Sequence, residues 1–217
     1  MYHSIEKEKS NYEYAISEQK LINQIKIIKK FFIIVPLHEL INKQSINFPR
    51  IALTFDDAFD DFFYNAFPIL KKNNIPATVF VPTAFIETDK SMIEGKKHCS
   101  WQQMKEMMET GLIDFQSHGH CHKHFKNMDI ITLKNDIMLS KKIIEENLSN
   151  KVDMFAYPGG KFHDWQNDVI LKMGYKAVFT SISKTIHRER KVLPRLTITD
   201  KCDSINFKML ISGINEI

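Results

Sequence analysis

Short apolar runs alternate with longer amphipathic stretches along the whole chain. The short runs predict β-strands, because they are rich in β-branched and aromatic residues and are bounded by turn residues. The longer stretches repeat their apolar residues with helical spacing and predict α-helices. Strands are expected at residues 30–37, 51–55, 77–81, 113–116, 154–157, 177–180 and 196–198, and helices around 21–28, 60–72, 100–109, 132–147, 164–174 and 204–211.

Strands separated by helices of this length predict βα units and therefore a parallel sheet. Roughly seven such units can close into a barrel, in which reactive groups lie at the C-terminal ends of the strands. Ser100 and Asp164 are expected to cap the helices that follow them. No low-complexity tract, internal repeat or Pro/Gly-rich linker divides the chain. We therefore expect one α/β domain over residues 1–217.

Composition and charge narrow the function classes. The 217 residues are 43% hydrophobic and 26% charged, as in a soluble globular protein, and the net charge of +4 is scattered. Without a basic stripe interleaved with aromatic residues, no nucleic-acid partner is expected. The longest apolar run is too short to span a bilayer.

The cellular compartment is predicted from the cysteines and the N-terminal residues. Cys99, Cys121 and Cys202 cannot all pair, which favours a reducing compartment. Residues 1–6 lack the basic and apolar regions of a secretory signal. A complete gene product with these features would be cytoplasmic, whereas an exported protein whose leader had been removed would look the same.

Two adjacent carboxylates, Asp56 and Asp57, directly follow the predicted strand 51–55. The backbone turns where a strand ends, so both side chains can approach one cavity. Two close anions repel each other, and a divalent cation on one of them removes that conflict. The other is then free to take a proton from a metal-bound water. The alternative interpretation is a solvent-exposed turn.

Four histidines follow another predicted strand, at positions 118, 120, 122 and 124. They cannot all bind one ion. The spacing of His118 and His122 suits two ligands from a strand end and the following turn, and with Asp57 they would leave coordination positions open for water. His120 and His124 are expected beside the site or facing solvent, and Cys121 as a small buried residue. A surface histidine patch and core histidines are the alternatives.

These segments resemble motifs of the polysaccharide deacetylases of the NodB-homology group, carbohydrate esterase family 4. Thr54-Phe55-Asp56-Asp57 is similar to the first motif, T-F-D-D. Residues 117–122 are similar to the second, H-(S/T)-x-x-H, with Gly119 in place of Ser or Thr. Residues 69–81 match the helix, turn and strand between them. The resemblance runs from about residue 2, where Tyr2-His3 is similar to a subgroup that opens with Y-H, to about residue 200.

The resemblance implies a distorted (β/α)7 barrel and hydrolysis of N-acetyl, less often O-acetyl, groups on a sugar. It implies Zn²⁺, or another divalent ion such as Co²⁺, Ni²⁺ or Mn²⁺, bound by Asp57, His118 and His122, with Asp56 as the general base. The substrate would be a polysaccharide or its lipid- or nucleotide-linked precursor. A cytoplasmic location favours the precursor, and a lipid-linked one would bring peripheral membrane contact. The oligomeric state stays open.

One departure from the family pattern concerns the residue that orients the base. The third motif, R-x-x-P-(Y/F), corresponds to residues 156–159, so Ala156 replaces the arginine that orients the base, as in a subgroup with F-A-Y-P-x-G. We expect Arg195 to supply the missing cation to Asp56. Tyr157, Pro158 and Gly159 are expected at the substrate, with the N–H group of Gly159 facing the oxyanion.

Two further family motifs are absent: the fourth, D-x-x-D-W, and the fifth, a leucine-histidine pair that carries the proton donor. His187, in a charged loop, is one candidate for this acid, and His3 is expected to line the pocket. A glycan-binding protein that keeps the metal site but catalyses weakly is therefore an alternative, although it would have no use for Asp56. A phosphoesterase, which usually needs two ions and more carboxylates, is a further alternative.

Overall fold

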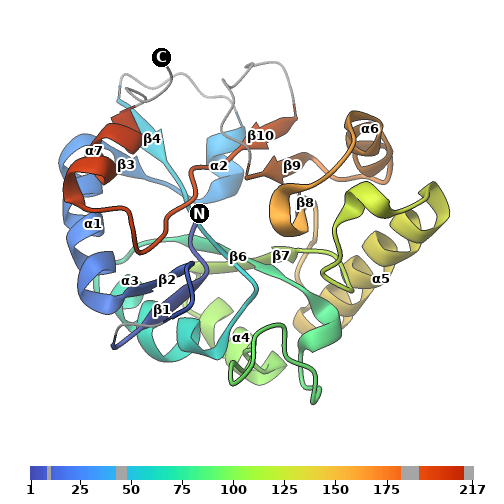
Figure 1. Ribbon diagram of the computed structural model, residues 1–217, viewed down its shortest axis with the longest axis horizontal. Coiled ribbons are helices and arrows are strands. Elements are labelled where there is room, and N and C mark those ends of the chain that lie inside the picture. Colours follow the sequence, from blue (N-terminus) through green and yellow to red (C-terminus); the bar gives the residue numbers. More distant parts are fainter. Residues whose placement is uncertain (9–10, 43–47, 182–190, 213–217) are drawn as a thin grey trace.

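The computed structural model describes residues 1–8, 11–42, 48–181 and 191–212, which form a curled parallel sheet surrounded by helices (Figure 1). The sheet has six strands in the order β10-β9-β8-β7-β6-β5. They are β5 (Leu53–Asp56), β6 (Ala77–Val81), β7 (Ile113–Ser117), β8 (Met154–Ala156), β9 (Ala177–Thr180) and β10 (Val192–Pro194). The parallel α/β fold is confirmed in this coarse form. The count of seven βα units is not, because the described residues place six strands in the sheet.

Around the curl, α1 and α7 lie on one flank and α5 and α6 on the other (Figure 1), while Leu37 of α2 belongs to the smaller of two apolar clusters. The helices are α1 (Glu18–Phe31), α2 (Leu37–Ile41), α3 (Phe67–Lys72), α4 (Trp101–Met108), α5 (Ile130–Leu148), α6 (Asp164–Lys172) and α7 (Ser204–Ser212). Shorter helical turns are η1 (Phe62–Ala66), η2 (Thr83–Phe85), η3 (Phe125–Asn127) and η4 (Pro158–Gly160). Two small parallel sheets pair β1 (Ser4–Glu6) with β2 (Ala15–Ser17) and β3 (Ile33–Ile34) with β4 (Arg50–Ile51). Among the described helices, none combines the length and the apolar composition needed to cross a bilayer.

Successive side chains along each strand point to opposite faces of the sheet, and the apolar ones therefore pack into two separate clusters. On β6, Val79 packs into the large cluster that also includes the buried faces of the helices, whereas Phe80 belongs to a smaller second cluster. On β8 and β9, Phe155 and Val178 join the large cluster, and Phe179 joins the smaller one. The smaller cluster therefore fills the inside of the curl, beneath the strand ends.

The first residues of the chain span the gap between the two edges of the sheet. The N–H group of Tyr2 donates to Thr54 O at 2.8 Å, and that of Asp56 donates to Tyr2 O at 2.9 Å. On the other side, the N–H group of Ile198 donates to Met1 O at 3.0 Å. Residues 1–3 are thus held beside the end of β5, near the centre of the view in Figure 1.

The predicted helices are all present, and most strands are close to their expected bounds. The strand expected at 30–37 is present only as the two residues of β3, since α1 runs to Phe31 and Pro36 holds the N-cap position of α2. The strand at 51–55 is interrupted at Ala52. The last strand is Val192–Pro194 rather than 196–198. Ser100 caps α4 as expected.

Two single-residue expectations are also wrong. Asp164 is the first residue of α6 and not its cap, because His163 holds the N-cap position and donates its N–H group to Gln166 Oε1. Cys121 is exposed and not buried, because its backbone is fixed in a surface turn.

The side-chain amide of Gln116 links β7 to β8, two strands that have only one pair of residues in register. Gln116 is buried, and its Oε1 atom accepts the N–H groups of Asp153 and Met154 at 3.0 and 2.9 Å. Its Nε2 atom donates to Lys151 O at 3.0 Å. Because Gln116 satisfies the backbone at the start of β8, it replaces ladder bonds that the short strand does not make.

We therefore expect Gln116→Met to lower the free energy of unfolding by about 2–4 kcal/mol, because two buried backbone N–H groups lose their acceptor. Urea denaturation monitored by circular dichroism measures this change. Gln102→Met, on the exposed side of α4, is the matched control and should stay within about 0.5 kcal/mol of the parent. Equal stability of the two variants would contradict the role given to Gln116.

Candidate metal centre

At the end of β5, the consecutive carboxylates of Asp56 and Asp57 point into the same space. Asp56 lies on the strand and is buried, and Asp57 and Ala58 adopt left-handed φ angles of 73° and 50°. Such angles are uncommon for residues with a β-carbon and break the alternation of side chains. The turn is held by His98, whose Nδ1 donates to Asp57 O at 2.8 Å, and by the N–H group of Cys99, which donates to Ala58 O at 2.8 Å.

The end of β7 supplies two imidazoles. His118 is buried, and its Nδ1 atom donates to Ala156 O at 2.8 Å, so Nε2 carries the free lone pair. His122 follows in the turn with a left-handed φ of 52°. The rings of the two histidines lie 5.1 Å apart, centroid to centroid. A backbone carbonyl that fixes the tautomer and orientation of a ring is the usual support of a metal-binding histidine.

Asp57, His118 and His122 converge as expected, with one potential ligand atom from each lying within 4.8 Å of the others. The Nε2 atoms of His118 and His122 are 3.5 and 3.1 Å from Asp57 Oδ1. That oxygen is buried and has no hydrogen-bond partner among the described residues. An unpaired buried carboxylate oxygen facing two imidazole nitrogens fits a divalent cation.

The surroundings set the charge of each group. Burial alone would raise the pKa of Asp57, but the neighbouring imidazoles, led by His122, outweigh it and hold the pKa well below its usual value. Burial lowers the pKa of His118 to about 4, so this imidazole is neutral near pH 7. Burial also acts to lower the pKa of His122, yet the nearby Asp57 carboxylate raises it overall.

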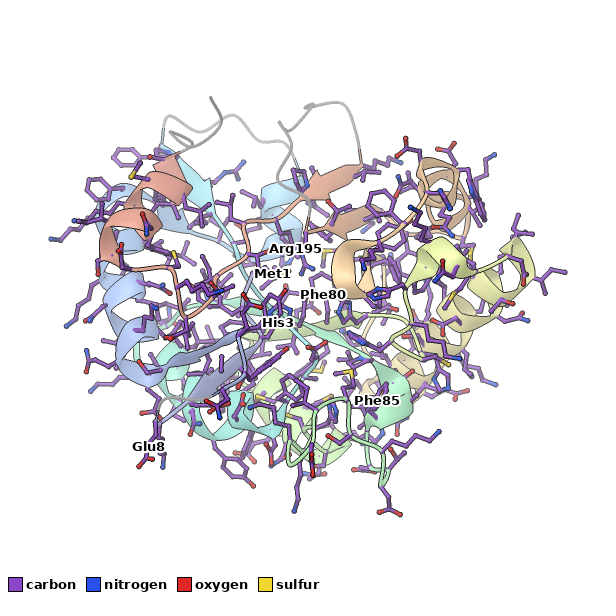
Figure 2. The ribbon with its side chains drawn as sticks, viewed as in Figure 1. Met1, His3, Glu8, Phe80, Phe85 and Arg195 are labelled. Atoms are coloured by element: carbon purple, nitrogen blue, oxygen red, sulfur yellow. The ribbon has the colours of Figure 1, made fainter. Side chains whose placement is uncertain are left out.

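Asp56 is paired with Arg195, the cation expected from the sequence. Two parallel bonds join Nη1 to Oδ1 at 2.6 Å and Nη2 to Oδ2 at 2.7 Å, with both residues buried. The guanidinium also lies over the ring of Phe80, 5.0 Å from its centroid. Burial acts to raise the pKa of Asp56, and Arg195 outweighs it, so the carboxyl is ionised at neutral pH. Figure 2 shows Arg195, Met1, His3 and Phe80 gathered near the centre of the view.

His3 lies beside the carboxylates, because residues 1–3 run along β5. The charges of Asp57 and Asp56 act on its imidazole, although burial dominates and lowers its pKa. Its Nδ1 atom is buried without a partner among the described residues, and its ring packs against exposed Tyr14 at 4.9 Å. His187, the other sequence candidate for a proton donor, lies outside the described residues.

Residues 157–159 lie next to the site, but the Tyr157 side chain points away from it. Its ring is buried and stacks on Phe162 at 4.4 Å, and its hydroxyl donates to Asn167 at 3.0 Å. The ring is therefore part of the core, and the expected place of Tyr157 at the substrate stays a prediction. Pro158 is buried, and Gly159 is exposed with a φ of 60°. A β-carbon on Gly159 would lie 2.4 Å from Cε1 of His124, so the His124 ring occupies the space that a side chain at position 159 would need.

Several residues that support the site carry no recognisable motif in the sequence. His98 holds the Asp57 carbonyl, and Phe80 carries the Arg195 guanidinium. Thr83 Oγ1 lies 2.9 Å from Nδ1 of His120, in the turn between the two proposed histidine ligands. Strand alternation on β6 could have placed Phe80 inside the curl, whereas a loop residue such as His98 gives no such signal.

Comparison with known proteins decides the family. The sequence profile described as polysaccharide deacetylase matches residues 43–178. The chain belongs to the polysaccharide deacetylase family. The predicted class of enzyme, a carbohydrate deacetylase, is thereby confirmed at the level of the family. The F-A-Y-P-x-G subgroup stays a prediction.

Curated relatives of this deacetylase family member extend over most of the chain. A poly-beta-1,6-N-acetyl-D-glucosamine N-deacetylase of Staphylococcus aureus is 31% identical in an alignment of 203 residues. The alignment covers 86% of this chain and 69% of the relative. The enzyme of the same name from Staphylococcus epidermidis is 30% identical over 204 residues, again 86% of this chain and 69% of the relative.

Solved structures of similar proteins share the fold. The Streptococcus pyogenes deacetylase PplD, in complex with acetate, superposes with a TM-score of 0.83 at 22% identity, covering 96% of this chain and 95% of its own. IcaB from Ammonifex degensii gives a TM-score of 0.83 at 23% identity, covering 97% and 93%. The curled parallel sheet is therefore that of known deacetylase structures.

We expect Asp57→Asn to weaken Zn²⁺ binding by more than about 100-fold. Loss of a group that only hydrogen-bonds to a metal ligand already costs about 10- to 100-fold in affinity, and Asp57 is itself a proposed ligand. Metal analysis after dialysis and competition with a chromophoric chelator measure the change. Asp168→Asn, on the exposed side of α6, is the matched control and should bind zinc like the parent. An Asp57→Asn protein with the parent's zinc affinity would contradict the site.

Proposed function

We propose that this protein is a metal-dependent N-deacetylase acting on a β-1,6-linked N-acetylglucosamine polymer. The observation that carries the proposal is the arrangement of Asp56, fixed by Arg195, beside the convergent group of Asp57, His118 and His122. The staphylococcal relatives, which carry the name of this reaction, support the choice of substrate. They favour the polymer over a lipid- or nucleotide-linked precursor.

Asp57, His118 and His122 would hold the divalent ion. Two imidazoles and one carboxylate suit Zn²⁺ and also accept Co²⁺, Ni²⁺ or Mn²⁺. When bound, such an ion lowers the pKa of a water ligand and polarises an acyl oxygen. The ligand atoms are already gathered, because carbonyl and backbone contacts fix His118 and the Asp57 turn.

Asp56 would act as the general base. Its carboxylate is ionised and lies next to the proposed ligand group, with Oδ2 3.8 Å from Nε2 of His118. Arg195 uses one lone pair on each carboxylate oxygen and leaves the others free to accept a proton. The bidentate contact fixes the orientation of the carboxylate, which a single bond would leave free to rotate.

His3 and Gly159 would line the pocket for the acetylated sugar. His3 is held at the edge of β5, with a buried Nδ1 atom that has no partner among the described residues. Gly159 is exposed beside His124. Glycan binding without catalysis gains no support from this arrangement, because the base and its cation are both in place.

The test is acetate release from β-1,6-linked N-acetylglucosamine oligomers by zinc-loaded protein. We expect turnover that a chelator abolishes, and an Asp56→Asn variant that keeps its zinc but loses about 100- to 10,000-fold in kcat, as loss of a general base predicts. β-1,4-linked oligomers serve as the linkage control and should react more slowly. Zinc-loaded protein that releases no acetate, or an equally active Asp56→Asn variant, would contradict the proposal.

Arg195→Met should lower activity by about 100-fold through loss of orientation of Asp56, while zinc content stays at the parent level. Because Arg195 holds the pKa of Asp56 down, its removal should raise that pKa and move the acidic limb of the activity profile to higher pH. Arg50→Met, whose guanidinium contacts Glu39 O, is the matched control. An unchanged rate and pH profile in folded Arg195→Met would remove this role.

A further inference from the structure

The turn between the two proposed histidine ligands is fastened to α5 by one carboxylate. Asp136 accepts two successive backbone N–H groups, that of His120 on Oδ1 at 2.7 Å and that of Cys121 on Oδ2 at 2.9 Å. Asp136 is 7% exposed. Bonds to an ionised acceptor are stronger than neutral ones, and burial removes the competition of bulk water.

Gly119 makes room for this carboxylate. It has a left-handed φ of 76°, and a β-carbon at this position would lie 2.7 Å from Asp136 Oδ1 and 3.3 Å from the ring of Phe125. This is the position at which the second family motif carries Ser or Thr. In this chain, therefore, a carboxylate from α5 occupies the space that a side chain at 119 would take.

Further contacts fix the turn on both sides. Ser117 Oγ lies 2.9 Å from Ser140 Oγ of α5 and accepts the N–H group of Gly119 at 3.2 Å. On the opposite side, the N–H groups of Thr83 and Ala84 in η2 donate to Gly119 O at 3.3 Å and His120 O at 3.0 Å. Asp136 is the charged member of this set and binds the two residues that immediately precede His122.

We propose that Asp136 is a positioning residue for the metal centre, which sets the geometry of His122 through the turn it holds. His122 keeps a φ of 52°, a conformation that a residue with a β-carbon adopts only where its surroundings impose it. Two bonds to the preceding N–H groups impose it. The inference rests on the metal-dependent function proposed above, and it concerns ligand geometry and not the chemical step.

The test compares Asp136→Asn with Asp129→Asn. Asp129 caps the same helix by accepting the N–H groups of Ile131 and Thr132 and does not touch the turn. Zn²⁺ affinity is measured by competition with a chromophoric chelator, and coordination geometry by the visible spectrum of the Co²⁺-substituted protein. Thermal unfolding with a chelator and with saturating Zn²⁺ separates stability from binding.

In Asp136→Asn, the amide can accept one N–H group but presents its own NH₂ to the other. We expect the zinc dissociation constant to rise about 10- to 100-fold, the usual cost of losing an outer partner of a ligand, with an altered Co²⁺ spectrum. Asp129→Asn should keep the parent's zinc affinity and spectrum, and its stability should change little, because asparagine caps a helix about as well as aspartate. Asp136→Ala, which removes both acceptors and adds no donor, should behave like Asp136→Asn and replaces it if that variant fails to fold.

Parent-like zinc affinity and Co²⁺ spectrum in a folded Asp136 variant would overturn the inference. A similar loss of affinity in Asp129→Asn would also overturn it, because the effect would then come from α5 as a whole. If the Asp136 variants lose zinc affinity while the parent releases no acetate from any oligomer, the inference holds and the proposed deacetylase activity fails.

Discussion

Burial of two adjacent carboxylates at the end of β5 is the constraint on which the rest of the site depends. Asp56 and Asp57 are both nearly inaccessible to solvent. Two such anions can remain ionised only if each meets its own positive partner. Arg195 meets Asp56 with two short bonds, and the nitrogen atoms of His118 and His122 surround Asp57. This division leaves Asp57 for the proposed metal ion and Asp56 for the proposed role of general base.

The fold achieves this division by bringing together segments that are far apart in the sequence. Asp56 and Arg195 are separated by 139 positions, and their contact depends on the curl of the sheet from β5 round to β10. Left-handed turns at Asp57 and His122 then redirect the ligand side chains. Both turns are held by groups outside the proposed ligand set, His98 for the first and Asp136 for the second. Ligand geometry thus rests on backbone hydrogen bonds from neighbouring elements.

Much of the fold and of the ligand set could be predicted from the sequence, because both leave local signals. β-Branched runs followed by helical periodicity marked most strands, and the motifs around Asp57, His118 and His122 marked the proposed metal site. The expected Arg195–Asp56 contact is present, although its catalytic role stays a proposal.

Other features could not be predicted, because they depend on tertiary packing and the residue pattern of a single segment carries no information about its neighbours. Residues 31–37 are apolar, yet Phe31 and Ile33 are exposed, so this run forms no buried strand. Tyr157 follows β8, but its hydroxyl finds Asn167 in the core, a tertiary contact that no spacing reveals.

The most direct test is a crystal structure of the protein grown with Zn²⁺, with the ion identified by its anomalous signal. The account predicts one zinc bound by Asp57, His118 and His122, with at least one position left to water or acetate. It also predicts that Asp56 stays outside the coordination sphere and paired with Arg195. Zinc bound by both aspartates, or by another set of side chains, would contradict it.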